Sequence, residues 1–66
     1  MPKKYPDITV KLSDEDGNAH AIMGRVVGAL RKGGVSKAEI HKYLKEAQSG
    51  DYGNLLRVTM HWVYTY

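Results

Sequence analysis

The sequence contains no cysteine and no phenylalanine, and only two of its residues are proline. Without cysteine, the chain forms no disulfide and offers no thiolate ligand to a metal. Its three histidines, His20, His41 and His61, are about twenty residues apart, so no two of them have the short spacing of a zinc-binding pair. We therefore expect no metal site and no cofactor.

Long apolar runs are also missing. No stretch approaches the ~20 apolar residues that cross a bilayer. Residues 1–7 lack the apolar segment of a signal peptide. These two absences lead us to expect a cytoplasmic protein without a membrane partner.

The 66 residues that are present suit one small domain, 1–66, with a thin hydrophobic core. Lysine and arginine outnumber aspartate and glutamate by 10 to 7, which gives a net charge of +3. This balance permits an acidic protein, a nucleotide or a nucleic acid as partner and requires none of them. Residues 1–7, with two lysines and two prolines, are predicted to be a flexible basic arm.

Apolar spacing predicts a strand followed by two helices. Residues 8–12 alternate apolar and polar side chains, which is typical of a strand with one buried face. After an acidic turn at 13–18, residues 19–32 repeat apolar side chains with helical spacing, and Asn18 precedes them as a helix cap. A second helix is expected from Ser36, its N-cap, to about Gln48, with Glu39 completing a capping box.

The C-terminal third is open to two interpretations. Residues 54–66 alternate almost without interruption, which favours one long strand. Asp51, however, can cap a helix in which Leu55, Thr59 and Met60 share one face. We favour a helix over about 51–60 and a short strand at 61–65 that pairs with residues 8–12. The expected fold is α+β, in the order β-α-α-α-β, with a two-stranded sheet packed on a helical hairpin.

Two glycines, Gly24 and Gly28, interrupt the first predicted helix, where each costs roughly 1 kcal/mol relative to alanine. Helical geometry places both on the side away from the apolar stripe. They leave a smooth surface that another backbone or a phosphate can approach closely. The predicted partner-binding residues are Gly24, Gly28, Arg25, Arg31, Lys32 and His20. In the alternative interpretation, Gly24 packs against the C-terminal segment of the same chain and has no binding role.

A second surface suggests nucleic-acid binding. The segment 30–44 has the glycine turn and following helix of a helix-turn-helix unit, although the same residues also form an ordinary helix stop and capping box. In this interpretation Lys37, His41, Lys42 and Lys45 face the major groove. A third interpretation is capture of a nucleotide or another small anion between subunits, near Arg25, Arg31 and Lys32.

The sequence contains no arrangement of residues that suits catalysis. The serines lie at predicted turns and caps, and the carboxylates at 14–16 form a charge run in a turn. No glycine-rich phosphate loop has the known spacing. We therefore expect no catalytic residues and no enzyme activity.

The segments YPDITVKL, EDGNAHAIMGRV and SGDYGNLL resemble a group of very short bacterial and phage-type hypothetical proteins. No established activity follows from this resemblance, which implies only a small autonomous protein. Together the residues lead us to expect a non-enzymatic binding or regulatory protein, of the kind that phage-type inhibitors represent, docking on a protein partner. We also expect a homodimer that continues the sheet through Trp62, Tyr64 and Tyr66, because a two-stranded sheet is barely stable alone.

Overall fold

The structure, a computed structural model, describes residues 3–14 and 17–66. Its elements are β1 (Thr9–Val10), α1 (Ala19–Lys32), α2 (Lys37–Ala47), α3 (Tyr52–Trp62) and β2 (Tyr64–Thr65). This is the predicted β-α-α-α-β order of a small α+β domain. Residues 1–2 of the predicted arm and 15–16 of the predicted turn lie outside the described residues.

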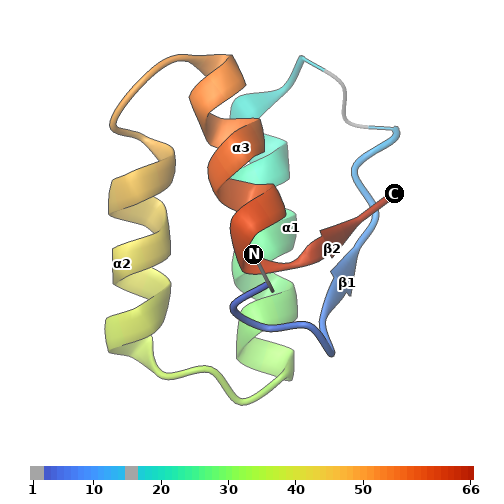
Figure 1. Cartoon of the computed structure of the whole chain (residues 1–66), viewed down its shortest axis with the longest axis vertical. Helices are drawn as coiled ribbons and strands as arrows, with labels where there is room; N and C mark the ends of the chain where they lie inside the picture. The colour runs from blue at the N-terminus through green and yellow to red at the C-terminus, as the bar shows by residue number, and fades with distance from the viewer. Residues whose placement is uncertain (1–2, 15–16) are drawn as a thin grey trace.

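The helices run alternately down, up and down in Figure 1, and the sheet lies on the side of the molecule away from α2. Helix α3 contacts α1, α2 and β2, and α1 also contacts β1. None of the helices within the described part of the chain is long and apolar enough to cross a membrane.

The sheet joins the first and last elements in parallel, with Thr9 opposite Tyr64 and Val10 opposite Thr65. Its backbone bonds extend beyond these pairs, because Tyr64 donates to the Ile8 carbonyl and Leu12 donates to the Tyr66 carbonyl. The predicted pairing of 8–12 with the C-terminal segment is confirmed, although the regular part of each strand is only two residues long.

Capping residues set the helix boundaries. The Asn18 side chain accepts a hydrogen bond from the Ala21 N–H, and the Ser36 side chain accepts one from the Glu39 N–H. Gly34, with a φ of +84°, adopts the left-handed conformation just beyond α1. The boundaries of both predicted helices are therefore confirmed to within a residue or two.

Helix α3 decides between the two interpretations of the C-terminal third. Its N-cap is Asp51, whose carboxylate accepts a hydrogen bond of 2.9 Å from the Asn54 N–H. Leu55, Thr59 and Trp62 then lie one above the other on the buried face. One long strand is therefore wrong, and the helix continues through Trp62, two residues beyond the favoured prediction. Met60, expected on the buried face, is 45% exposed.

The core fills the space between the helices and the inner face of the sheet. It includes Ile22, Val26 and Leu30 from the apolar stripe of α1, all fully buried. It also includes Tyr43, which the sequence pattern missed. The Tyr43 hydroxyl lies 2.7 Å from the Thr59 hydroxyl, so two buried polar groups satisfy each other.

Residues 3–5 lie against the folded domain, in a segment where the sequence predicts a flexible arm. The Lys4 and Tyr5 N–H groups donate to the carbonyls of His61 and Trp62. The Tyr5 ring also packs against the Trp62 ring, and the two ring centroids are 5.7 Å apart. The C-terminal end of α3 is thus covered by the start of the described chain.

Candidate functional site

The outer face of α1 is open at both of its glycines. Gly24 and Gly28 are exposed, and a Cβ placed on either would meet no atom of residues 3–14 and 17–66 within 4 Å, apart from the neighbouring backbone of the helix itself. Gly24 therefore does not pack against the C-terminal segment, and that alternative is wrong. The space above both glycines is available to another molecule.

A shallow depression of about 310 Å³ lies between this helix and β1. Three cationic side chains, Lys11, Arg25 and Lys32, border it, and Gly28 and Ala29 keep its helical side low. We call the set of lining residues the basic depression; it consists of Thr9, Val10, Lys11, Arg25, Gly28, Ala29 and Lys32.

The basic depression divides the binding residues predicted from the sequence. Arg25, Gly28 and Lys32 come together in it, whereas His20, Gly24 and Arg31 are not among its lining residues. Lys11, the residue directly after β1, joins the set. The alternation of residues 8–12 marks Lys11 as outward-facing, but no local pattern shows which helix lies beside that strand.

Arg25 connects the two sides of the depression. One of its guanidinium nitrogens donates to the Lys11 carbonyl at 3.1 Å and lies 3.2 Å from an Asp14 carboxylate oxygen. Its positive charge is therefore partly balanced within the chain. Within residues 3–14 and 17–66, by contrast, neither Lys11 nor Lys32 lies within ion-pair distance of a carboxylate.

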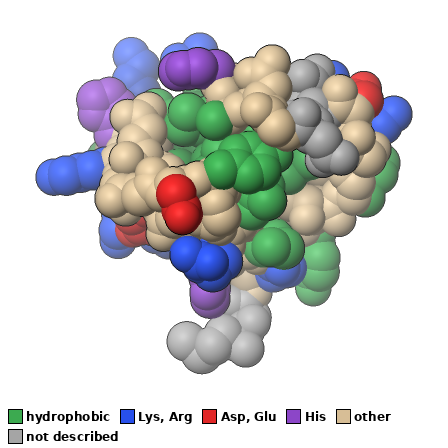
Figure 2. All heavy atoms as spheres, turned by 90° about the horizontal axis from the view of Figure 1, so that it is seen from above, with side chains coloured by type: hydrophobic (Ala, Val, Ile, Leu, Met, Phe, Trp, Pro, Cys, Tyr) green, Lys and Arg blue, Asp and Glu red, His purple; other side chains and the backbone are tan. Residues whose placement is uncertain are grey.

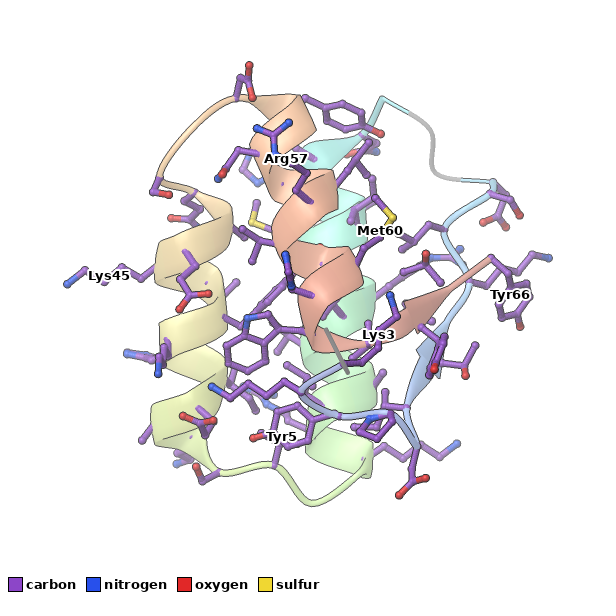
Figure 3. All side chains as sticks on the ribbon, in the orientation of Figure 1. Lys3, Tyr5, Lys45, Arg57, Met60 and Tyr66 are labelled. Atoms are coloured by element: carbon purple, nitrogen blue, oxygen red, sulfur yellow. The ribbon has the colours of Figure 1, made fainter. Side chains whose placement is uncertain are left out.

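The alternative nucleic-acid residues lie on α2. Lys37, His41, Lys42 and Lys45 are all exposed. Figure 3 shows Lys45 pointing away from the other helices. In Figure 1, α1 and α2 run side by side in opposite directions. In helix-turn-helix proteins the two helices instead meet at a steep angle.

The three predicted dimer residues have different environments. Trp62 is only 3% exposed, and its indole N–H donates to the Glu46 carboxylate at 3.1 Å. It belongs to the core of the single chain. Tyr64 is 49% exposed and Tyr66 is 66% exposed, so only these two offer an open aromatic surface to a second copy.

A second basic hollow, of about 350 Å³, was not foreseen. It is lined by Lys3, Arg57, Met60 and His61, and Figure 3 shows Arg57 and Met60 along α3 and Lys3 near the lower end of that helix. Lys3 belongs to the docked N-terminal segment and donates to the Met60 carbonyl. Arg57, Met60 and His61 lie on successive turns of α3, whereas Lys3 is distant in sequence and reaches them only in the folded structure.

A third hollow, of about 200 Å³, opens at the end of the molecule where α1 and α3 begin. Ala19, Met23, Tyr52 and Leu55 contribute to its lining. Figure 2 looks at this end and shows hydrophobic side chains at its centre.

An electrostatic cluster surrounds Glu39. Its carboxylate lies 2.9 Å from the Lys4 ammonium and accepts a hydrogen bond of 3.0 Å from the Tyr5 hydroxyl. These two donors lower the pKa of Glu39, and the same carboxylate raises the pKa of Lys4. Partial burial, followed by the bond to Glu39, raises the pKa of Tyr5. The cluster fastens the N-terminal segment to α2.

Across residues 3–14 and 17–66, no three histidine, aspartate or glutamate side chains gather in a group that could hold a metal. Comparison with protein-family models, with curated proteins and with solved structures finds no match to this chain. The surfaces described above are therefore the basis for assigning a function.

Proposed function

We propose that this chain is a small non-enzymatic binding protein that docks on a protein partner through the basic depression. One observation carries the proposal: α1 has open glycines directly beside a concave surface bordered by Lys11, Arg25 and Lys32. Exposed glycines cost helix stability, and the space that they leave is useful only to a molecule that approaches closely.

Filling the depression tests the proposal. Leucine in place of Gly28 directs an apolar side chain into open space, because no atom of the described residues outside the helix's own backbone lies within 4 Å of the added Cβ. We expect the Gly28→Leu variant to fold and to lose the protein that the unchanged chain captures from a nuclease-treated lysate. Mass spectrometry of the captured material measures the loss.

The matched control places the same bulk elsewhere. Ala38 is exposed on α2, so Ala38→Leu adds a similar apolar side chain outside the depression and should leave capture intact. Equal capture by both variants would remove the basic depression from consideration as the docking surface.

Nucleic-acid binding through α2 is the second candidate, because four exposed side chains there are basic or histidine: Lys37, His41, Lys42 and Lys45. Phosphate contacts would make the affinity fall steeply with salt. Lys42→Glu with Lys45→Glu should then abolish binding to duplex DNA, while Gly28→Leu should not affect it. A flat salt response would exclude this candidate.

Homodimerisation is compatible with either function, and the exposed rings of Tyr64 and Tyr66 favour it. Sedimentation of the chain should give twice the mass of one copy, and serine at both positions should return it to one. A single-chain mass for the unchanged protein would count against the dimer.

A further inference from the structure

The strand β1 pairs on one side only. The carbonyls of Ile8 and Val10 and the N–H of Leu12 bond with the segment that contains β2. Backbone groups of successive residues point to opposite edges of a strand. The N–H and C=O groups of Thr9 and Lys11 therefore lie on the other edge.

That edge is largely unoccupied. Arg25 donates to the Lys11 carbonyl. The Thr9 N–H, the Thr9 carbonyl and the Lys11 N–H have no hydrogen-bond partner among residues 3–14 and 17–66. Three backbone groups are thus presented in a row, which is the arrangement that an added strand recognises.

The surface beside this edge leaves room for such a strand. Thr9, Val10 and Lys11 form one side of the basic depression, and Gly28 and Ala29 form the other. Since a Cβ on Gly28 would meet no side chain and no distant backbone of the described residues within 4 Å, this position of the helix leaves space beside the edge.

The charge of the surface selects the occupant. Lys11 and Lys32 border the depression. A second copy adding its own β1 here would bring like-charged lysines together, in a chain that already carries +3. An extended peptide with acidic side chains meets opposite charge instead.

Building on the proposed function, we propose that the partner supplies an extended acidic segment that adds as a third strand to the free edge of β1. Its backbone bonds with Thr9 and with the Lys11 N–H, and its carboxylates face Lys11 and Lys32. The open space at Gly28 accommodates the added strand.

The test uses the whole chain, labelled with ¹⁵N, and a blocked peptide in which glutamate alternates with valine. We expect this peptide to shift the amide resonances of Thr9 and Lys11 and those of α1 around Gly28. A matched peptide with lysine in place of glutamate should leave them unchanged. Added salt should weaken the binding of the acidic peptide.

Two variants separate backbone recognition from charge. Thr9→Pro removes an N–H that faces away from β2 and spares the bonds to β2. Strands tolerate proline at such an edge position. The variant should bind the acidic peptide about tenfold more weakly. Lys11→Glu with Lys32→Glu should reverse the preference, so that the lysine peptide binds and the glutamate peptide does not. This reversal keeps the test valid even if Thr9→Pro fails to fold.

The outcomes also distinguish this proposal from the proposed function. No binding of the acidic peptide, binding that shifts other amides only, or binding unchanged in both variants would overturn strand addition. So would a concentration-dependent shift of the Thr9 and Lys11 amides without peptide, since a second copy would then occupy the edge. In all of these cases, docking at the basic depression would still be supported if Gly28→Leu, and not Ala38→Leu, fails to capture the partner protein from the lysate.

Discussion

At the scale of single residues, the paired hydroxyls of Tyr43 and Thr59 make the sharpest prediction. Both side chains are fully buried, and their oxygens are 2.7 Å apart. Thr59→Val keeps the shape and removes one partner, which leaves the Tyr43 hydroxyl buried without a hydrogen bond. We expect the free energy of unfolding in urea to fall by about 1–3 kcal/mol.

The double variant is the control. With Tyr43→Phe added, no polar group is stranded, so the loss in Thr59→Val plus Tyr43→Phe should be smaller than the sum of the two single losses. Losses that simply add would show that the two hydroxyls contribute independently.

The Glu39 carboxylate predicts an acid-sensitive attachment of the N-terminal segment. Its pKa in the folded chain lies below the ordinary 4.5. The stabilisation is therefore complete above about 4.5 and is lost as the pH falls through the lower folded-state pKa. We expect the urea midpoint to drop over this window, and only modestly, because the side chains of Lys4 and Glu39 are 37% and 32% exposed to solvent.

Glu39→Gln is the matched variant for this prediction. It removes the titrating group and should flatten the pH dependence of the urea midpoint over the same window. An unchanged acid response in this variant would assign the effect to other carboxylates.

At the scale of elements, two glycines make α1 less stable than the same helix would be with alanine at both positions. A Cβ at Gly24 or Gly28 would meet no atom within 4 Å in the part of the chain that the structure describes, the adjacent helix backbone aside. Gly24→Ala and Gly28→Ala should therefore each raise the free energy of unfolding by about 0.5–1 kcal/mol. Gly34→Ala is the contrasting control, because a φ of +84° disfavours any Cβ, and it should lower stability. If Gly24→Ala and Gly28→Ala both lower the free energy of unfolding, the outer face of α1 is not open.

The starts of the helices were the part that the sequence predicted best, whereas both strands are shorter than predicted. Asn18, Ser36 and Asp51 each cap a helix through a bond to a neighbour three residues away. Such signals lie within one turn of the chain and do not depend on the rest of the fold. The alternation of residues 54–66 suggested a strand that does not form, because an apolar sequence can fit a two-residue period and a helical period at once. The Asp51 cap and the burial of one face against α2 favour the helix.

At the scale of the whole molecule, the contacts that create the sites could not be predicted. Tyr5 reaches Glu39, and Arg25 reaches Lys11. No local pattern encodes either contact, since each depends on how distant elements pack. The basic face of α1 was therefore predictable, whereas the strand edge beside it and the hollow at Lys3 were not.

The pairing of the first strand with the last has a consequence for the order of folding. Helices α2 and α3 are neighbours in sequence and pack on one another, so their contacts form over short loops. The parallel pairing of β1 with β2 joins residues near the two ends of the chain and closes a long loop, and such contacts form late.

Stopped-flow kinetics can detect this order. Val10, 4% exposed in β1, contributes to the late contacts. Val10→Ala should speed unfolding and barely change the folding rate, whereas Ile40→Val in α2 should slow folding. If Val10→Ala and Ile40→Val slow folding to the same extent, this order of folding is wrong. If the sheet closes last it also opens first, so the edge strand of the native chain exchanges its amide protons sooner than the helices do.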